Sequence, residues 1–227
     1  VGFAGSVGGL VPSFDGISSV LAPAGAGDTL TGRDANANWT IGTSSGSYVD
    51  AGTVRTLTFS GVDALVGGAN NDAFAVGSNV TADIAGGTGD DSVSIATDVT
   101  LTTTVAVTLG DGTDSVTLAS GARLAGAVQG GAGNDTFTLG DSASITGQVQ
   151  GGADTDSLSF AGYASARSVA LTGTTANGFT GTEAAVTGGF TGIDSLTGST
   201  SASTDILTGL NNANALWRLD ATNSYEE

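Results

Sequence analysis

The stretch Gly130-Gly-Ala-Gly-Asn-Asp-Thr-Phe-Thr-Leu139 decides the fold, because its pattern recurs along the chain. It joins a glycine-rich turn to a short segment in which apolar residues alternate with hydroxyl residues. Such alternation is typical of a β-strand with one buried face, so Phe137 and Leu139 are expected to point inward and Thr136 and Thr138 outward. The aspartate at the start of the segment recurs at intervals of 19, 23, 21 and 21 residues, at Asp72, Asp91, Asp114, Asp135 and Asp156.

A second apolar segment lies between successive aspartates, as Leu124 with Val128 and Ile145 with Val149 illustrate. One period therefore holds a turn, a strand, a bend and another strand, without an amphipathic helical pattern. A unit this short cannot bury its apolar face alone and must stack on its neighbours.

The repeat predicts an all-β fold, namely a right-handed parallel β-helix (solenoid) over residues 1–227, with about 21 residues per coil and about 4.8 Å between coils. The expected rows of core side chains are Phe74, Val76, Val93, Ile95, Val116, Leu118, Phe137, Leu139, Leu158 and Phe160. Aspartate and threonine are expected to cover the outside.

A longer repeat overlies the short one. Phe14-Asp-Gly-Ile-Ser-Ser-Val20 returns as Phe190-Thr-Gly-Ile-Asp-Ser-Leu196, and Asp28-Thr-Leu-Thr-Gly32 returns as Asp205-Ile-Leu-Thr-Gly209. The offsets are 176 and 177 residues. We therefore expect about one full long repeat, followed by the start of the next copy, within a parent protein that carries many copies. These two parts are residues 14–189 and residues 190–227.

The residue inventory excludes several classes of chemistry. The chain has no Cys, His or Met, and 22 acidic residues against five arginines give a net charge of −17. Thiol and imidazole catalysis, zinc sites built from Cys and His, and lysine Schiff bases are therefore excluded. The negative charge disfavours nucleic acid as a partner, and no apolar run approaches the roughly 20 residues of a membrane-spanning helix. Aspartates, hydroxyl groups and backbone carbonyls remain, and these suit hard cations such as Ca²⁺.

Stacking of coils places the repeated aspartates in one column. Carboxylates about 4.8 Å apart repel each other by about 1 kcal/mol in water and by about 3 to 4 kcal/mol at an effective dielectric constant of 20. This repulsion favours either a fully solvated column or a bound divalent cation. The candidate metal ligands are Asp72, Asp91, Asp114, Asp135 and Asp156, with Asp90 and Asn134 beside them in the turns. The alternative is that Gly-Asn-Asp and Gly-Asp-Asp serve only as tight turns.

Residues outside the column have simpler expected roles. Trp39 and Trp217 occupy equivalent places in the long repeat, so burial in the core or capping of a coil is expected for both. Arginines such as Arg33 and Arg167 form no cluster in the sequence, and solvation or ion pairs with the aspartate column are expected for them.

Two stretches carry a family resemblance. Gly130–Thr138 and Gly86–Ser94 match the nonapeptide G-G-x-G-x-D-x-U-x of calcium-binding RTX repeats at every position. Leu30–Ile41 and Phe59–Leu65 resemble the long repeats of very large secreted bacterial adhesins and filamentous-haemagglutinin-like β-helix proteins. The resemblance implies an extracellular or cell-surface location and Ca²⁺ as a cofactor. RTX coils carry two motifs each, whereas one falls in each period here, so calcium is expected along one edge only.

These patterns together predict a structural segment of a large extracellular bacterial repeat protein, such as an adhesin stalk, a surface filament or a matrix fibre. The expected partners are further copies of the chain, joined end to end or laterally, and surface glycans or host or matrix proteins. An alternative is an S-layer or RTX-type lattice assembled by calcium. A polysaccharide-active β-helix enzyme is disfavoured, because the paired carboxylates of Asp90 and Asp91 lie in the most regular part of the repeat and adjacent strand residues face opposite ways.

Overall fold

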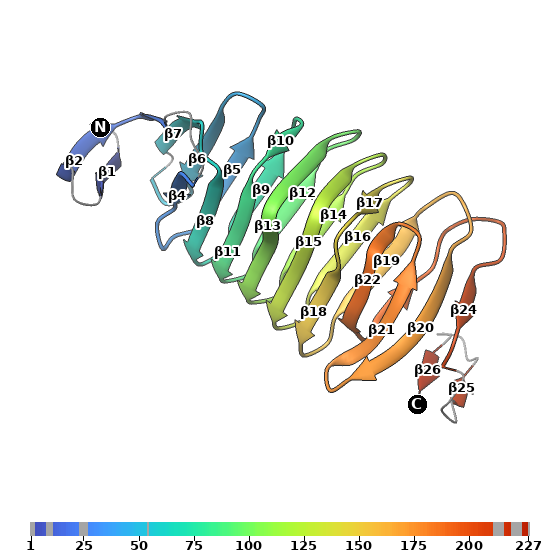
Figure 1. The fold of residues 1–227 in the computed structure, drawn as a ribbon. Helices are drawn as coiled ribbons and strands as arrows, with labels where there is room; N and C mark the ends of the chain where they lie inside the picture. Colours follow the sequence, from blue (N-terminus) through green and yellow to red (C-terminus); the bar gives the residue numbers. More distant parts are fainter. Residues whose placement is uncertain are drawn as a thin grey trace.

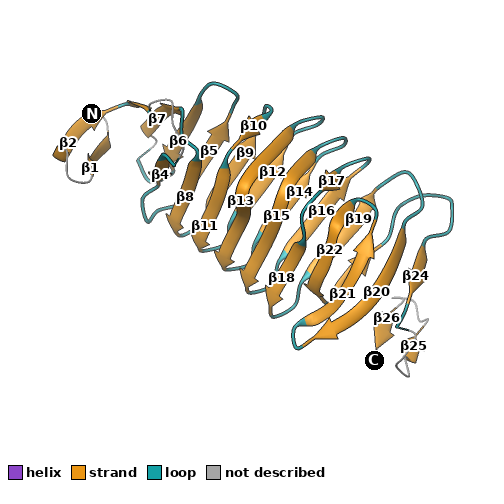
Figure 2. Cartoon of the chain, in the orientation of Figure 1, coloured by secondary structure: helices purple, strands orange, loops and turns teal. Residues whose placement is uncertain are grey.

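The computed structural model describes residues 3–7, 11–22, 27–53, 55–210, 216–218 and 224–226. These residues form β-strands, turns and loops, and none of them is helical (Figure 2). The described chain accordingly holds no helix that could cross a membrane. The strands build one sheet of twelve strands, one of ten, and two separate hairpins. The predicted all-β class is confirmed.

The strands occupy the following positions in the sheets. The ten-stranded sheet has the order β23 (Ser195–Thr197), β19 (Ser157–Gly162), β16 (Thr136–Gly140), β14 (Ser115–Leu118), β12 (Ser92–Ile95), β9 (Asp72–Val76), β5 (Ala37–Ile41), β6 (Gly46–Asp50), β7 (Arg55–Ser60) and β3 (Ser19–Leu21). The main path of the twelve-stranded sheet has the order β24 (Ile206–Thr208), β20 (Ser168–Thr175), β21 (Gly178–Glu183), β22 (Val186–Ile193), β17 (Ser144–Ile145), β15 (Arg123–Ala132), β13 (Thr100–Asp111), β11 (Asp83–Thr88), β8 (Ala64–Ala69) and β4 (Thr29–Thr31). Beside this path, β10 (Val80–Thr81) pairs with β13, and β18 (Val149–Ala153) pairs with β15 and β22. The hairpins are β1 (Phe3–Val7) with β2 (Val11–Ile17), and β25 (Leu216–Arg218) with β26 (Ser224–Glu226).

The centre of the molecule, residues 64–162, is regular. The chain alternates between the two large sheets, and each strand from β8 to β16 pairs in parallel with the strand one period later (Figure 1). Phe74 pairs with Val93, Val93 with Val116, Val116 with Phe137, and Phe137 with Leu158, so one apolar row crosses five strands. All ten predicted core residues are 0 to 1% exposed, which confirms the predicted rows.

The paired glycines of the turns allow this close stacking. Gly131 has φ +129°, and a Cβ atom there would collide with the carbonyl oxygen of Gly110 in the preceding coil. A Cβ atom at Gly130 would collide with the carboxylate of Asp135. The second glycine thus permits the backbones to approach, and the first leaves room for the aspartate side chain.

The one interval of 23 residues has a local cause. Pairing of β13 with β15 shifts between Thr102 and Ala106, and the intervening residues bulge outward, leaving Val105 80% exposed. The carboxylate of Asp83 accepts hydrogen bonds from the backbone N–H groups of Thr104 (2.8 Å) and Val105 (2.9 Å). The extra residues are therefore accommodated in the strand, away from the turn that carries the aspartate.

Both ends of this regular stack contain an antiparallel meander. β5, β6 and β7 pair antiparallel in sequence, and so do β20, β21 and β22 (Figure 1). The structure here differs from the uniform 21-residue coil that the sequence predicts. The reason is local, since residues 42–58 and 171–185 lack the Gly-Gly turn followed by aspartate, and consecutive strands pair with each other instead.

Candidate functional site

The five repeated aspartates form one continuous column. Each lies at or directly before the first residue of a strand, and its backbone N–H donates a hydrogen bond to the carboxylate of the aspartate in the next coil. The N···Oδ1 distances are 2.7 Å from Asp72 to Asp91, 2.6 Å from Asp91 to Asp114, 2.9 Å from Asp114 to Asp135 and 2.8 Å from Asp135 to Asp156. Asp194 ends the row, because its Oδ2 accepts from the N–H of Asp156 at 2.9 Å.

The column lies inside the molecule. The five aspartates are 0 to 1% exposed, so the expectation that they cover the outside is wrong. The glycines of each turn leave an interior space, and the aspartate side chain turns into it. Asp91, Asp114, Asp135 and Asp156 there accept the backbone N–H of the preceding aspartate in the column. Within the described part of the chain, the Oδ2 atoms of all five carboxylates have no hydrogen-bond partner. Each coil thus carries one buried carboxylate oxygen whose hydrogen-bonding capacity is unused.

Burial changes the acidity of these groups. Loss of solvation raises the pKa of Asp72 and Asp156 to about 6 and that of Asp91 and Asp135 to about 7, against an ordinary value of 3.8. It raises the pKa of Asp114 as well. Hydrogen bonds from backbone N–H groups oppose the rise, and neighbouring carboxylates add to it for Asp91, Asp114, Asp135 and Asp156. The pKa values of Asp72, Asp91, Asp135 and Asp156 therefore lie close to neutral pH.

The other two candidate ligands lie in an outer row. Asp90 and Asn134 are exposed, and their Oδ1 atoms accept hydrogen bonds from the backbone N–H groups of Thr113 (2.8 Å) and Thr155 (2.9 Å). Both side chains thus link one turn to the next, which is the role that the turn-only interpretation assigns to them. In the described residues, no group of three or more His, Cys, Asp or Glu side chains is arranged to hold a metal ion. Calcium binding stays a prediction.

Trp39 closes one end of the column. Its indole Nε1–H donates to Oδ1 of Asp72 at 3.3 Å, and its ring stacks on Phe74 with a centroid distance of 5.4 Å. Trp39 is 1% exposed, which confirms the predicted core or capping role. The side chain of its repeat equivalent, Trp217, lies outside the described residues.

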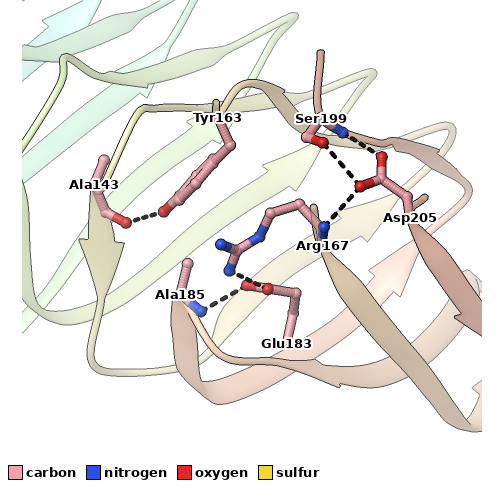
Figure 3. A network of polar contacts seen from close by, with 7 residues as sticks. All are labelled: Ala143, Tyr163, Arg167, Glu183, Ala185, Ser199 and Asp205. Carbon is pink, nitrogen blue, oxygen red and sulfur yellow. Dashed lines mark hydrogen bonds and ion pairs between the residues drawn. The ribbon is translucent and has the colours of Figure 1, made fainter. Parts of the chain in front are cut away.

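A second polar cluster lies in the meander of β20, β21 and β22 (Figure 3). The guanidinium of Arg167 pairs with the carboxylate of Glu183, which also accepts the backbone N–H of Ala185 at 2.6 Å. The guanidinium carbon lies 4.1 Å from the ring centroid of Tyr163, whose hydroxyl donates to the carbonyl of Ala143. The side chain of Glu183 is 1% exposed and that of Arg167 12%, so this ion pair is largely desolvated.

The first meander repeats the arrangement. Arg33 pairs with Asp50 at 2.5 Å, and Oδ1 of Asp50 accepts the backbone N–H of Gly52 at 2.8 Å. In both meanders an arginine precedes the first strand, and a buried acid 16 or 17 residues later ends the middle strand and caps its own turn. Solvation or ion pairs with the aspartate column are the two expectations for Arg33 and Arg167. Neither pairs with the column, because each meander supplies its own acid, whereas the side chain of Arg33 is solvated, with 60% of it exposed. This spacing of 16 or 17 residues between arginine and acid is the feature of the sequence that could have predicted the two ion pairs. A search for a 21-residue period does not find it.

An open groove of about 620 Å³ lies beside the first meander. Its walls carry hydroxyl and amide groups, including those of Thr43 and Asn79, and Asp63 is its one charged lining residue. The Asp63 carboxylate accepts hydrogen bonds from the backbone N–H groups of Gly27 (2.9 Å) and Asp28 (3.1 Å). The groove therefore does not contain the two carboxylates that glycoside hydrolysis ordinarily requires.

No family model, no curated protein and no solved structure matches the chain.

Proposed function

We propose that the chain is a β-helical solenoid segment with a structural role in a large extracellular bacterial repeat protein, such as an adhesin stalk, a surface filament or a matrix fibre. The observation that carries this proposal is the in-register parallel pairing across the centre, where the same position of each coil stacks from Phe74 to Leu158. A strand ladder of this kind resists extension along many backbone hydrogen bonds at once.

Spin-label distances test the solenoid. The chain lacks cysteine, so labels attach only where cysteine is introduced. Ala75, Thr117 and Ser159 face outward in one row, with two coil steps between the first pair and four between the outer pair. The pair A75C/T117C should be separated by about 10 Å and A75C/S159C by about 19 Å, plus a constant contribution from the labels. Equal distances for the two pairs would contradict the stacked fold.

Immunogold labelling of intact cells tests the surface role. Antibodies against the folded chain should label surface material or filaments of the organism that encodes it. Label confined to the interior of sectioned cells would contradict the proposed location, whatever the fold.

A calcium-assembled lattice protein of the S-layer or RTX type is the second candidate. It is supported by the five buried Oδ2 atoms without a hydrogen-bond partner, which lie beside glycine-rich turns with backbone carbonyls. Calcium binds oxygen ligands of these two kinds. A cation in each turn would neutralise the column and satisfy the unused oxygen.

Thermal unfolding in millimolar calcium and in EDTA separates the candidates. If calcium binds the column, the melting temperature at pH 8 should fall in EDTA, and Asp135→Asn should reduce this fall. Asp111→Asn is the matched control, because it removes one exposed carboxylate near a turn of the same stack. An unchanged melting temperature in EDTA would mean that the aspartates serve only to form the turns and bind no calcium.

A further inference from the structure

The strands at the two ends of the molecule are equivalent in the long repeat. β3 and β4 are the last described strands of the two large sheets at one end, and β23 and β24 are the last at the other. Figure 1 labels β4 and β24 at the two ends. Ser195-Leu-Thr197 corresponds to Ser19-Val-Leu21, and Ile206-Leu-Thr208 corresponds to Thr29-Leu-Thr31. One sequence unit therefore forms both edges of the structure.

Each copy of this unit pairs on a different side. β3 and β4 pair with β7 and β8, which follow them in the chain, whereas β23 and β24 pair with β19 and β20, which precede them. The outer edges of β23 and β24 thus point in the direction in which the long repeat would place the next β7 and β8.

Exposed apolar side chains concentrate on these same strands. Four large apolar side chains are exposed in the described residues, and three of them are on the end strands. Leu21 on β3 is 81% exposed, and Ile206 and Leu207 on β24 are 57% and 37% exposed. The fourth, Val105, lies on the bulge of β13. Open strand edges with apolar side chains are sites for pairing with another chain.

We propose that two copies of the chain associate head to tail by strand exchange: β23 and β24 of one copy replace β3 and β4 on β7 and β8 of the next copy. This inference rests on the structural role proposed above and names its partner and register. Leu207 of one copy would then face Leu65 of the other, as Leu30 does within one chain. Likewise Leu196 would take the place of Val20 opposite Phe59.

Exchange needs little reorganisation. The incoming strands are already ordered by their pairing with β19 and β20, and they fill a position shaped by an equivalent sequence. The number of strand pairings is conserved, because each pairing that β3 and β4 lose is replaced by one with β23 or β24, and the open edge of β23 and β24 becomes buried. The contact joins different surfaces of the two copies, so it leaves a free end on each side and can propagate into a filament.

Disulfide trapping tests the register. In the exchanged assembly Thr208 lies in register with Val66 of the neighbouring copy, because Thr31 holds that place within one chain. In-register Cα atoms of adjacent strands are about 4.8 Å apart, within the roughly 4.4–6.8 Å that a disulfide spans. The variant V66C/T208C should form covalent dimers and longer oligomers under mild oxidation. T31C/V66C, the geometric control, should cross-link within one chain.

Sedimentation velocity on full-length variants gives an independent test with opposite expected signs. Leu207→Asp should weaken self-association about tenfold or more, because it places a charge on the incoming strand β24. Leu30→Asp should strengthen self-association by a similar factor, because this substitution loosens β4, the strand that exchange displaces. Val105→Asp, at the exposed bulge, should leave it unchanged.

Three results would overturn the exchange. A monomer at all concentrations without V66C/T208C cross-links would exclude it, and so would equal weakening by Leu207→Asp and Leu30→Asp. Cross-linking of T31C/T208C between chains would show that β24 of one copy pairs with the outer edge of β4 of the next copy and does not displace it. The spin-label distances report on the solenoid within one chain, so a failure of exchange is distinguishable from a failure of the proposed fold.

Discussion

The centre and the ends of the molecule bury acidic side chains in different ways. In the centre, the column aspartates after Asp72 receive one backbone N–H each and keep one oxygen without a hydrogen-bond partner, as Asp91 and Asp135 illustrate. In the meanders, Asp50 and Glu183 each pair with an arginine and also accept a backbone N–H group.

The difference follows from repetition. A choice made in one coil is repeated in the next, so an arginine beside each column aspartate would create a second column of like charges about 4.8 Å apart. The backbone N–H carries no net charge and can be stacked without this cost. A meander occurs once at each end, and a single bulky ion pair fits there.

The largest expected effect concerns the turn glycines of the centre, which allow its coils to stack. Gly131→Ala should abolish cooperative folding or cost more than about 4 kcal/mol, because the new Cβ meets the carbonyl oxygen of Gly110 at a strained φ of +129°. Thermal unfolding followed by circular dichroism measures the loss. Gly77→Ala is the control, since the nearest heavy atom to its Cβ is the carbonyl oxygen of Ile41 at 4.0 Å. Equal tolerance of the two changes would mean that the coils do not stack this closely.

A smaller effect is expected at the ends. Arg167→Met should cost about 3 kcal/mol, because it leaves the Glu183 carboxylate buried without its cation. Arg33→Met should cost about 1 kcal/mol or less, since the side chain of Arg33 is 60% exposed. Hydrogen exchange should accelerate in β20, β21 and β22 and stay slow in β14 and β16. Equal acceleration in both regions would show that centre and end unfold as one unit.

The smallest effect is the pH dependence of the column. The pKa of Asp135 is about 7 in the folded chain, against 3.8 as its ordinary value, so the folded state binds more protons between these limits. Stability in EDTA should therefore fall as pH rises from about 4 to about 7 and level off above it.

The melting temperature should be about 2 to 4 °C higher at pH 5 than at pH 8, which corresponds to about 1 kcal/mol for a chain of this length. Asp135→Asn should reduce this difference, whereas Asp111→Asn should not. A melting temperature that rises with pH over this range would show that the carboxylates are stabilised as anions.

The core rows and the alignment of the aspartates could be predicted from the sequence. Both depend on the 21-residue period, because residues one period apart come into contact when the coils stack. The sequence does not predict the inward direction of Asp135, since an aspartate that begins a strand can face either way and the backbone N–H of the previous coil decides between them. The 21-residue period does not predict the meanders, for a related reason. Arg167 and Glu183 meet through the pairing of neighbouring strands, and their spacing recurs in Arg33 and Asp50 of the other meander and not with the 21-residue period.

The bulge at Val105 shows where residues can be inserted into the chain without disturbing the stacked turns. Register is fixed at the corner where glycines and aspartates stack, and the 23-residue coil shows that added residues leave this corner intact. The Asp83 carboxylate holds the base of the bulge through Thr104 and Val105. Coil length is therefore free to vary on that side, and foreign peptides inserted there would be displayed from the flank while the stack beneath them stays aligned.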